Sequence, residues 1–99
     1  MTYNEIITAI NEHLGNSLKQ HWKDFYVGIT DNVDERLFGF HKVPEEGYWF
    51  ITCPADSEDI ARDVEKHFLT KGMDGGTGGG DEDTTFVYCY EIGPNTRER

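Results

Sequence analysis

Tyr26-Val27-Gly28-Ile29-Thr30-Asp31-Asn32 is the stretch of this 99-residue chain that decides its fold. Apolar side chains occupy every second position from Phe25 to Ile29, which is the period of a β-strand with two different faces. Tyr26 and Thr30 share the opposite face of that strand. Asp31-Asn32 then brings the side chains that commonly begin a helix. The stretch therefore predicts a strand, a tight turn and a helix in immediate succession.

The predicted helix runs to about His41. Val33, Leu37 and Phe40 recur at helical intervals and form a short apolar stripe. Arg36 lies in the middle of this helix, one residue before Leu37.

The rest of the chain continues the alternation of helices and strands. Thr2 to Glu5 has the spacing of a capping box, and the apolar pattern that follows predicts a helix from Tyr3 to about Leu14, ended by Gly15-Asn16. Later segments predict a strand over 48–53 closed by Pro54, a helix begun by Ser57 and ended by Gly72, and a strand over 85–90. We expect one α+β domain over residues 1–93, in which about three helices pack on a small three-stranded sheet, and a frayed tail over 94–99.

Composition and charge narrow the class of protein. No run of eighteen apolar residues occurs, and the start of the chain lacks the apolar core of a signal peptide, so we expect a soluble, cytoplasmic protein. Cys53 and Cys89 lie in apolar, strand-like runs, which predicts buried free thiols rather than a disulfide or a zinc site.

The formal charge of −10 opposes nucleic-acid binding, because it repels phosphate backbones unless the cations gather on one face. The basic residues are scattered along the sequence between acids. This charge balance supports solubility or a basic protein partner, and it disfavours a nucleic acid.

The quoted stretch, with the residues that follow it, resembles the second half of the GIY-YIG nuclease signature. In that family a tyrosine-aliphatic-glycine strand is followed by an arginine, a histidine and a metal-binding glutamate. Here Tyr26-Val27-Gly28, Arg36-Leu37, His41 and Glu65 stand in that order, and the resemblance extends from Phe25 to Leu69. It implies that the tyrosine helps to activate water, the arginine stabilises phosphate charge, and the glutamate holds one Mg²⁺ or Mn²⁺ ion.

Each of these residues also has an ordinary structural interpretation. Tyr26 can simply be an aromatic residue of the strand, and Arg36 a solvated or paired residue of the helix. His41 follows Arg36 by five positions, roughly 140° around an α-helix, whereas the family's histidine commonly follows by four. His41 is therefore either an active-site group or an exposed helix end. Glu65 borders the apolar stripe of its helix, which fits a metal ligand or a solvated carboxylate.

The family's first strand, which carries a glycine-aliphatic-tyrosine motif, is missing from its usual place, where this chain has Asn16 to Lys23. We hypothesise that the strand over 86–90 fills the vacant sheet position from the other end of the chain, so that Tyr88 or Tyr90 replaces the missing catalytic tyrosine. This hypothesis requires that strand to lie beside the Tyr26 strand.

The glycine-rich segment from Asp74 to Asp83 lacks the Gly-Lys-Ser/Thr ending of a phosphate-binding loop. Its composition predicts a mobile loop, with an acidic metal site from Asp74, Asp81 and Asp83 as the alternative.

Two functions remain open from the sequence. One is a divalent-metal-dependent endonuclease or phosphodiesterase that uses Tyr26, Arg36, His41, Tyr88 and Glu65. The other is a non-catalytic acidic binding or regulatory module on the same scaffold.

Overall fold

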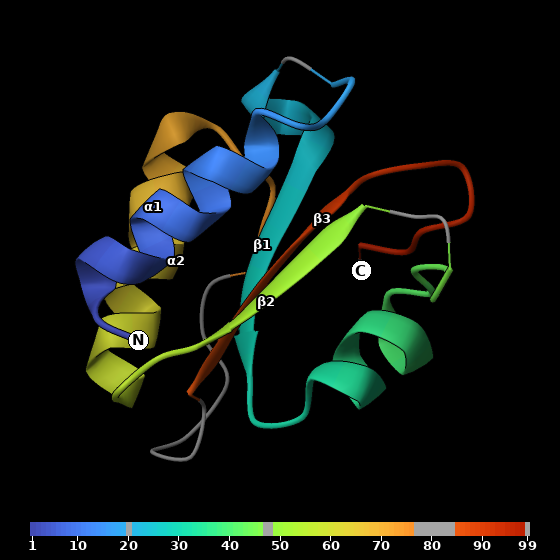
Figure 1. Ribbon diagram of the computed structural model, residues 1–99. Helices are drawn as coiled ribbons and strands as arrows, with labels where there is room; N and C mark the ends of the chain where they lie inside the picture. Colours follow the sequence, from blue (N-terminus) through green and yellow to red (C-terminus); the bar gives the residue numbers. More distant parts are fainter. Residues whose placement is uncertain (20, 47–48, 77–84, 99) are drawn as a thin grey trace.

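The predicted strands form one antiparallel sheet in the computed structural model, which describes residues 1–19, 21–46, 49–76 and 85–98. β1 (Phe25–Thr30), β2 (Phe50–Pro54) and β3 (Phe86–Glu91) lie in the spatial order β1-β3-β2 (Figure 1). The last strand in the sequence therefore lies between the first two and pairs with both. This arrangement meets the requirement of the strand-replacement hypothesis, because β3 lies directly beside β1.

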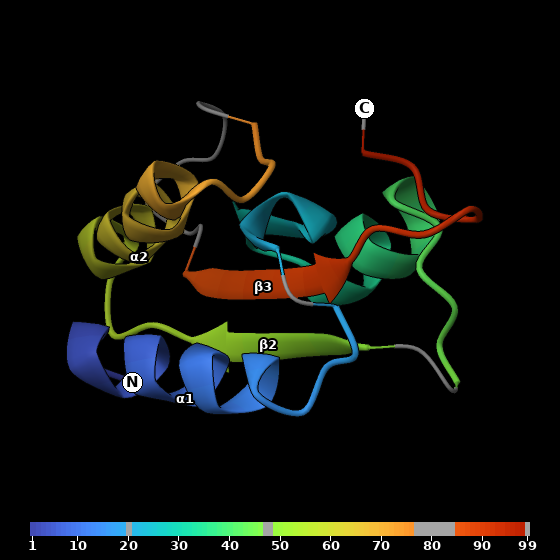
Figure 2. The ribbon, with the colours of Figure 1, turned by 90° about the horizontal axis from the view of Figure 1, so that it is seen from above.

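Two α-helices cover one side of this sheet, as Figure 2 shows. α1 (Tyr3–Leu14) begins with the predicted capping box, in which the Thr2 hydroxyl accepts the Glu5 amide and the Glu5 carboxylate accepts the Thr2 amide. α2 (Glu58–Lys71) is capped by Ser57 and ends at Gly72, whose φ of 117° is left-handed and favours glycine. Neither these helices nor any other among the described residues has the length and apolar character to cross a membrane.

The helix predicted after β1 is present but has a different geometry. A short 3₁₀ turn, η1 (Trp22–Asp24), precedes β1, and a π-helix, η2 (Glu35–Phe40), follows it on the other side of the sheet from α1 and α2 (Figure 2). The Asn32 side chain accepts the Glu35 amide, as the helix-start prediction required. The wider π-turn changes which side chains face the sheet: Leu37 is buried, whereas Phe40 is 38% exposed. The prediction that Phe40 faces the core is wrong for that reason.

The alternation of β1 gives the sheet a different core on each face. The α1 and α2 side buries the odd-numbered residues of β1 with apolar residues of both helices. Cys53 and Cys89 belong to this core as free thiols, as predicted. The η2 side buries a smaller, aromatic core made of Tyr26, Leu37, Val43, Tyr88 and Tyr90. The candidate catalytic tyrosines therefore lie together on the η2 face.

The segment after β3 turns back over the aromatic core. The Gly93 amide donates to the Thr96 hydroxyl at 2.9 Å, and the Thr96 amide donates to the Gly93 carbonyl at 3.2 Å. The Arg97 amide then donates to the His41 carbonyl at 2.6 Å. We expected the chain to fray from Pro94, whereas these hydrogen bonds anchor it between residues 93 and 97.

Candidate active site

Tyr88 lies across β1 because its partner in the sheet is a glycine. Gly28 and Tyr88 are directly opposite each other in the β1–β3 ladder, so their side chains share a face. A Cβ atom at Gly28 would lie 2.4 Å from both the Cζ and the hydroxyl oxygen of Tyr88. Gly28 therefore makes room for the Tyr88 ring.

The tyrosines and the histidine predicted from the sequence form one packed group, the tyrosine–histidine cluster (Tyr26, Tyr88, Tyr90 and His41). The Tyr26 ring lies nearly parallel to those of Tyr90 and Tyr88, with centroids 5.3 and 6.3 Å away. The His41 ring centroid is 4.6 Å from that of Tyr26. Both replacement candidates, Tyr88 and Tyr90, are thus in the cluster with Tyr26.

His41 is buried at the centre of this cluster and is 1% exposed. Its Nε2 is 2.8 Å from the Tyr88 hydroxyl, and its Nδ1 is 2.6 Å from the Arg97 carbonyl and 3.0 Å from the Tyr90 hydroxyl. Burial lowers the pKa of His41 below its ordinary value, an effect that the Arg97 hydrogen bond opposes. The alternative of an exposed helix end is therefore wrong, and His41 is a neutral ring at neutral pH.

The π-helix changes where His41 lies relative to Arg36, which precedes it by five positions. The His41 amide donates to the Arg36 carbonyl at 2.9 Å, the five-residue hydrogen bond that defines a π-turn. Each π-turn contains more residues than an α-turn, so it reduces the angular offset expected for five positions. The α-helical offset of roughly 140° therefore does not apply to this pair.

Arg36 connects the cluster to an open pocket. Its guanidinium carbon lies 4.9 Å from the centroid of the exposed Phe40 ring, a cation–π contact. The same guanidinium acts on the Tyr88 hydroxyl through its charge and through a hydrogen bond, both of which lower the pKa of Tyr88. Burial is the larger influence and raises that pKa above 10.0, assisted by Tyr26 and Glu65. Tyr88 is therefore a protonated phenol near neutral pH.

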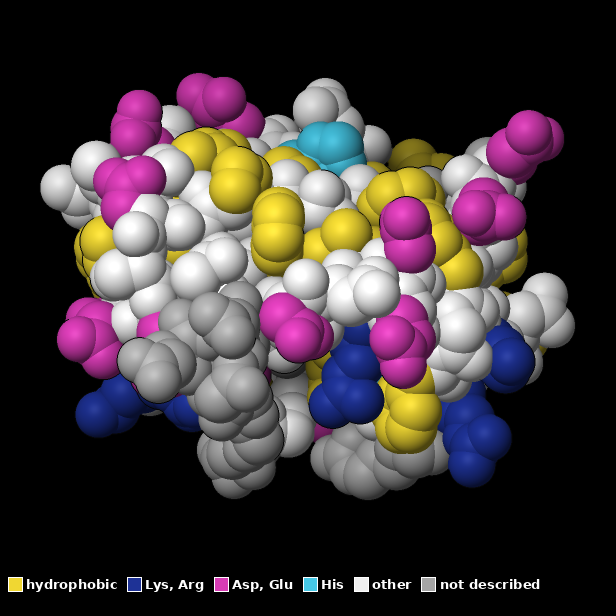
Figure 3. Space-filling model, turned by 90° about the horizontal axis from the view of Figure 1, so that it is seen from below, with side chains coloured by type: hydrophobic (Ala, Val, Ile, Leu, Met, Phe, Trp, Pro, Cys, Tyr) yellow, Lys and Arg dark blue, Asp and Glu magenta, His cyan; other side chains and the backbone are white. Residues whose placement is uncertain are grey.

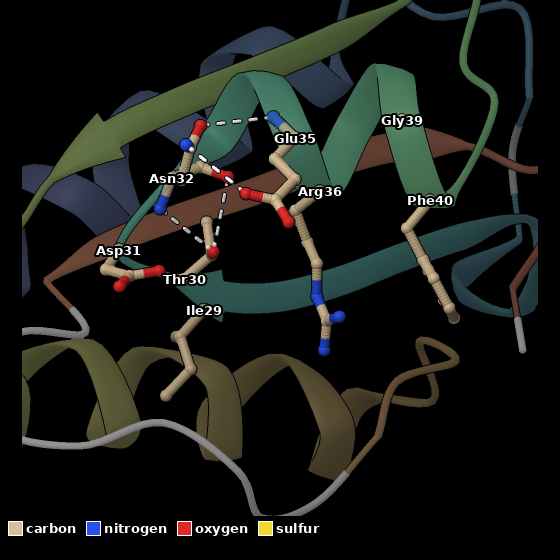
Figure 4. A pocket seen from close by; sticks show the side chains of 8 residues that line it. All are labelled: Ile29, Thr30, Asp31, Asn32, Glu35, Arg36, Gly39 and Phe40. Carbon is tan, nitrogen blue, oxygen red and sulfur yellow. Dashed lines mark hydrogen bonds between the residues drawn. The ribbon is translucent and has the colours of Figure 1, made fainter.

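The pocket beside Arg36, the Arg36 pocket, has a volume of about 430 Å³. Figure 4 shows the Arg36 side chain extending between Ile29 and Phe40, with the Asn32 and Glu35 side chains hydrogen bonded to each other at one end. Its lining combines one cation with two carboxylates: Ile29, Thr30, Asp31, Asn32, Glu35, Arg36, Gly39 and Phe40.

Glu65 of α2 is the predicted metal ligand, and it is buried rather than solvated, with 7% exposure. Burial raises its pKa from 4.5 to about 7, against a smaller opposite effect of the Arg62 charge. Its carboxylate is close enough to raise the pKa of Tyr88 by electrostatic repulsion. Tyr26, Arg36, Glu65 and His41 therefore all act on the Tyr88 hydroxyl or its ring.

The donor set fits a weakly bound divalent cation. Within the described part of the chain, no three His, Cys, Asp or Glu side chains gather as a metal site would require. Mg²⁺, however, is commonly held by one or two carboxylates, with waters and substrate phosphate completing its shell. Burial raises the pKa of Glu65 to about 7 because it disfavours the charged carboxylate. A bound cation would stabilise that charge. The alternative acidic site cannot be placed, because Asp81 and Asp83 lie outside the described residues.

Comparisons with protein-family models, with curated proteins and with solved structures found no match to this chain. The case for a site therefore depends on the geometry of its own side chains.

Sequence reasoning missed two contributions to this geometry. It did not identify Arg97, whose backbone carbonyl holds His41, nor Phe40 as the ring beneath Arg36. A backbone carbonyl has no residue-specific signal. The cation–π contact of Arg36 with Phe40 could have been found from their spacing, because residues four positions apart are neighbours on a helix.

Proposed function

We propose that this chain is a GIY-YIG-like, divalent-metal-dependent phosphodiesterase that cleaves nucleic acid. The observation that carries the proposal is the convergence on one phenol, that of Tyr88. His41 accepts its hydrogen bond at 2.8 Å, the Arg36 charge lowers the pKa of Tyr88, and the Glu65 charge raises it. These groups come from separate segments of the chain, and perturbed ionisable groups gathered beside a pocket are typical of catalytic sites.

The sheet order supports a permuted version of the family's site. β3 lies beside β1, where a first-motif strand would have to lie to bring its tyrosine to Tyr26. Tyr88 takes the catalytic place in this proposal and Tyr90 the supporting one, because Arg36 acts on Tyr88 whereas Glu98 binds Tyr90.

The chemistry is hydrolysis of a phosphodiester by a proton relay. The raised pKa of Tyr88 means that its phenol is a poor base alone, so His41 Nε2, 2.8 Å away, takes the phenolic proton as the phenol oxygen takes one from water. The water oxygen bonds to phosphorus, and the bond from phosphorus to the leaving oxygen breaks. His41 carries the proton gained and returns it to the leaving oxygen or to solvent.

In this scheme Arg36 and Glu65 stabilise the negative charge of the phosphoryl group, Arg36 directly and Glu65 through a bound cation. Arg36 is exposed at the pocket and its charge acts on the Tyr88 phenol, so in this proposal its guanidinium binds the phosphoryl oxygens beside the attacking water. Glu65, ionised when Mg²⁺ or Mn²⁺ is bound, holds the cation. The bound cation supplies Lewis-acid stabilisation of charge on the phosphoryl group.

A second candidate is a non-catalytic acidic module that binds a basic protein partner. Two observations favour it: Asp31 and Glu35 share the pocket with Arg36, and the Tyr88 side chain is only 1% exposed. In Figure 3 acidic side chains are spread over the face, whereas Lys and Arg gather in the lower half of the view. On the face that this figure shows, the basic side chains offer nucleic acid only a limited contact area, and acidic side chains are spread across the rest.

Cleavage of labelled single- and double-stranded DNA and RNA at low salt with Mg²⁺ or Mn²⁺ distinguishes the two candidates. Low salt favours weak phosphate contacts. The enzyme hypothesis predicts cleavage that chelator, Arg36→Ala and Glu65→Ala abolish. Matched controls on the exposed side of α2, Lys66→Ala and Asp63→Ala, make the same charge changes and retain cleavage. If the wild type cleaves no substrate faster than Arg36→Ala and Glu65→Ala do, the result favours the acidic module.

A further inference from the structure

The segment Gly93–Glu98 contacts the proposed site at His41. A turn closed by Gly93 and Thr96 directs the chain over the cluster, and two hydrogen bonds of 2.6 Å then join residues 41 and 97. In one, the Arg97 amide donates to the His41 carbonyl. In the other, the His41 ring meets the Arg97 carbonyl. The backbone and the side chain of His41 are thus both fixed by the same residue.

Hydrogen-bond chemistry determines which ring nitrogen of His41 carries the proton. A backbone carbonyl only accepts, so the Nδ1 atom facing the Arg97 oxygen must be the N–H donor. In a neutral imidazole, Nε2 is then the acceptor, and the Tyr88 hydroxyl donates to it. The relay of the proposed mechanism needs this tautomer, because a protonated Nε2 could not take the Tyr88 proton.

The neighbouring Tyr90 and Glu98 reinforce the arrangement. The Tyr90 hydroxyl lies 3.0 Å from His41 Nδ1 and 2.9 Å from a Glu98 carboxylate oxygen. Since the carboxylate accepts only, Tyr90 donates to Glu98 and presents its oxygen to the Nδ1 proton. Both partners of Nδ1 are therefore acceptors, and neither stabilises the other tautomer.

We propose that Gly93–Glu98 is a positioning segment, which holds His41 in its Nδ1–H tautomer through the Arg97 carbonyl so that Nε2 can accept the Tyr88 proton. The catalytic part of this inference rests on the proposed phosphodiesterase function. The tautomer assignment does not, because it follows from the hydrogen bonds alone. Arg97 is a positioning residue, because its carbonyl acts through the His41 ring.

Nitrogen-15 NMR of the histidine rings tests the proposal without requiring activity. The chain has four histidines, and the His41 signals are assigned by their loss in His41→Gln. Two variants disrupt the contact. Deletion of residues 94–99 removes the Arg97 carbonyl, and Arg97→Pro keeps a carbonyl at this position but loses the amide hydrogen bond that anchors it to His41. Arg97→Ala is the matched control, because it changes the side chain and keeps both backbone hydrogen bonds.

The proposal predicts the Nδ1–H tautomer in the wild type and in Arg97→Ala, and its loss in the deletion and in Arg97→Pro. If the deletion variant does not fold, Arg97→Pro decides by the same criterion. Two results would overturn the proposal. One is a wild-type His41 ring protonated at Nε2, and the other is an unchanged tautomer in a folded deletion or Arg97→Pro variant.

The second readout is the kcat and KM of each variant, measured on a substrate that the wild type cleaves. The two disruptive variants should lower kcat by about tenfold or more, the range expected when a general base is misaligned, while KM stays unchanged. A raised KM with unchanged kcat would contradict a positioning role. Failure of the wild type to cleave any substrate would count against the proposed function, while the NMR result would still decide whether the segment sets the tautomer.

Discussion

Replacing Gly28 with alanine should destabilise the protein by forcing the Tyr88 ring away from β1. The new Cβ would lie 2.4 Å from Tyr88 Cζ and 2.8 Å from Cε1, distances that require the ring or the strand to move. Such overpacking costs about 1–3 kcal/mol. Displacing Tyr88 also breaks its 2.8 Å hydrogen bond to His41 and leaves a buried acceptor unpaired, which costs about another 1–3 kcal/mol.

Alanine in a strand recovers at most about 1 kcal/mol relative to glycine. We therefore expect Gly28→Ala to lower the free energy of unfolding by about 1–6 kcal/mol, measured by urea denaturation. Gly39→Ala is the control, because the nearest heavy atom to a Cβ there is Glu35 Cγ at 3.9 Å. The control should stabilise the protein by about 0.5–1 kcal/mol. A Gly28→Ala protein as stable as the wild type would refute the close packing of Tyr88 on Gly28.

Three further substitutions test separate contacts. The unfolded chain loses the Glu65 proton near pH 4.5 and the folded chain near pH 7, so stability should fall as pH rises between them, by about 3 kcal/mol in total. Glu65→Gln should remove that decline in urea denaturation at pH 5 and 8, and an unchanged difference between the two pH values would contradict the buried carboxyl. Phe40→Ala should change stability by less than about 1 kcal/mol while raising KM, because Arg36 loses its stacking partner; an unaltered KM would show that the stacking does not orient Arg36. Ser57→Ala should cost about 1 kcal/mol in unfolding free energy through the lost α2 cap, and no change would show that the Ile60 amide finds another acceptor.

Local sequence signals predicted most of the architecture. Thr2, Ser57 and Gly72 marked helix ends because capping depends on side chains within one turn of the end. The alternation around Tyr26 marked β1, and the period of two also placed Tyr88 and Tyr90 on one face of their strand.

The members of the tyrosine–histidine cluster could be named from the sequence, but their environment could not. His41 is buried because β3 and residues 93–98 cover it, and such contacts between distant segments leave no local pattern. Glu65 borders the apolar stripe of α2, and whether such a border position is solvated depends on what packs beside it. The π-helix was missed because its extra residue per turn breaks the α-helical period from which Phe40 was assigned to the core.

The central claim, that the Tyr88 hydroxyl relays the proton in phosphodiester cleavage, is tested most directly by comparing single-turnover cleavage rates of Tyr88→Phe and Tyr90→Phe. The two tyrosines occupy one face of β3, and both contact His41, so each variant loses one hydroxyl from the same cluster. The account predicts that Tyr88→Phe lowers the rate by about 100-fold or more, and Tyr90→Phe by less than about tenfold. Equal rates for the two variants, or full activity of Tyr88→Phe, would contradict it.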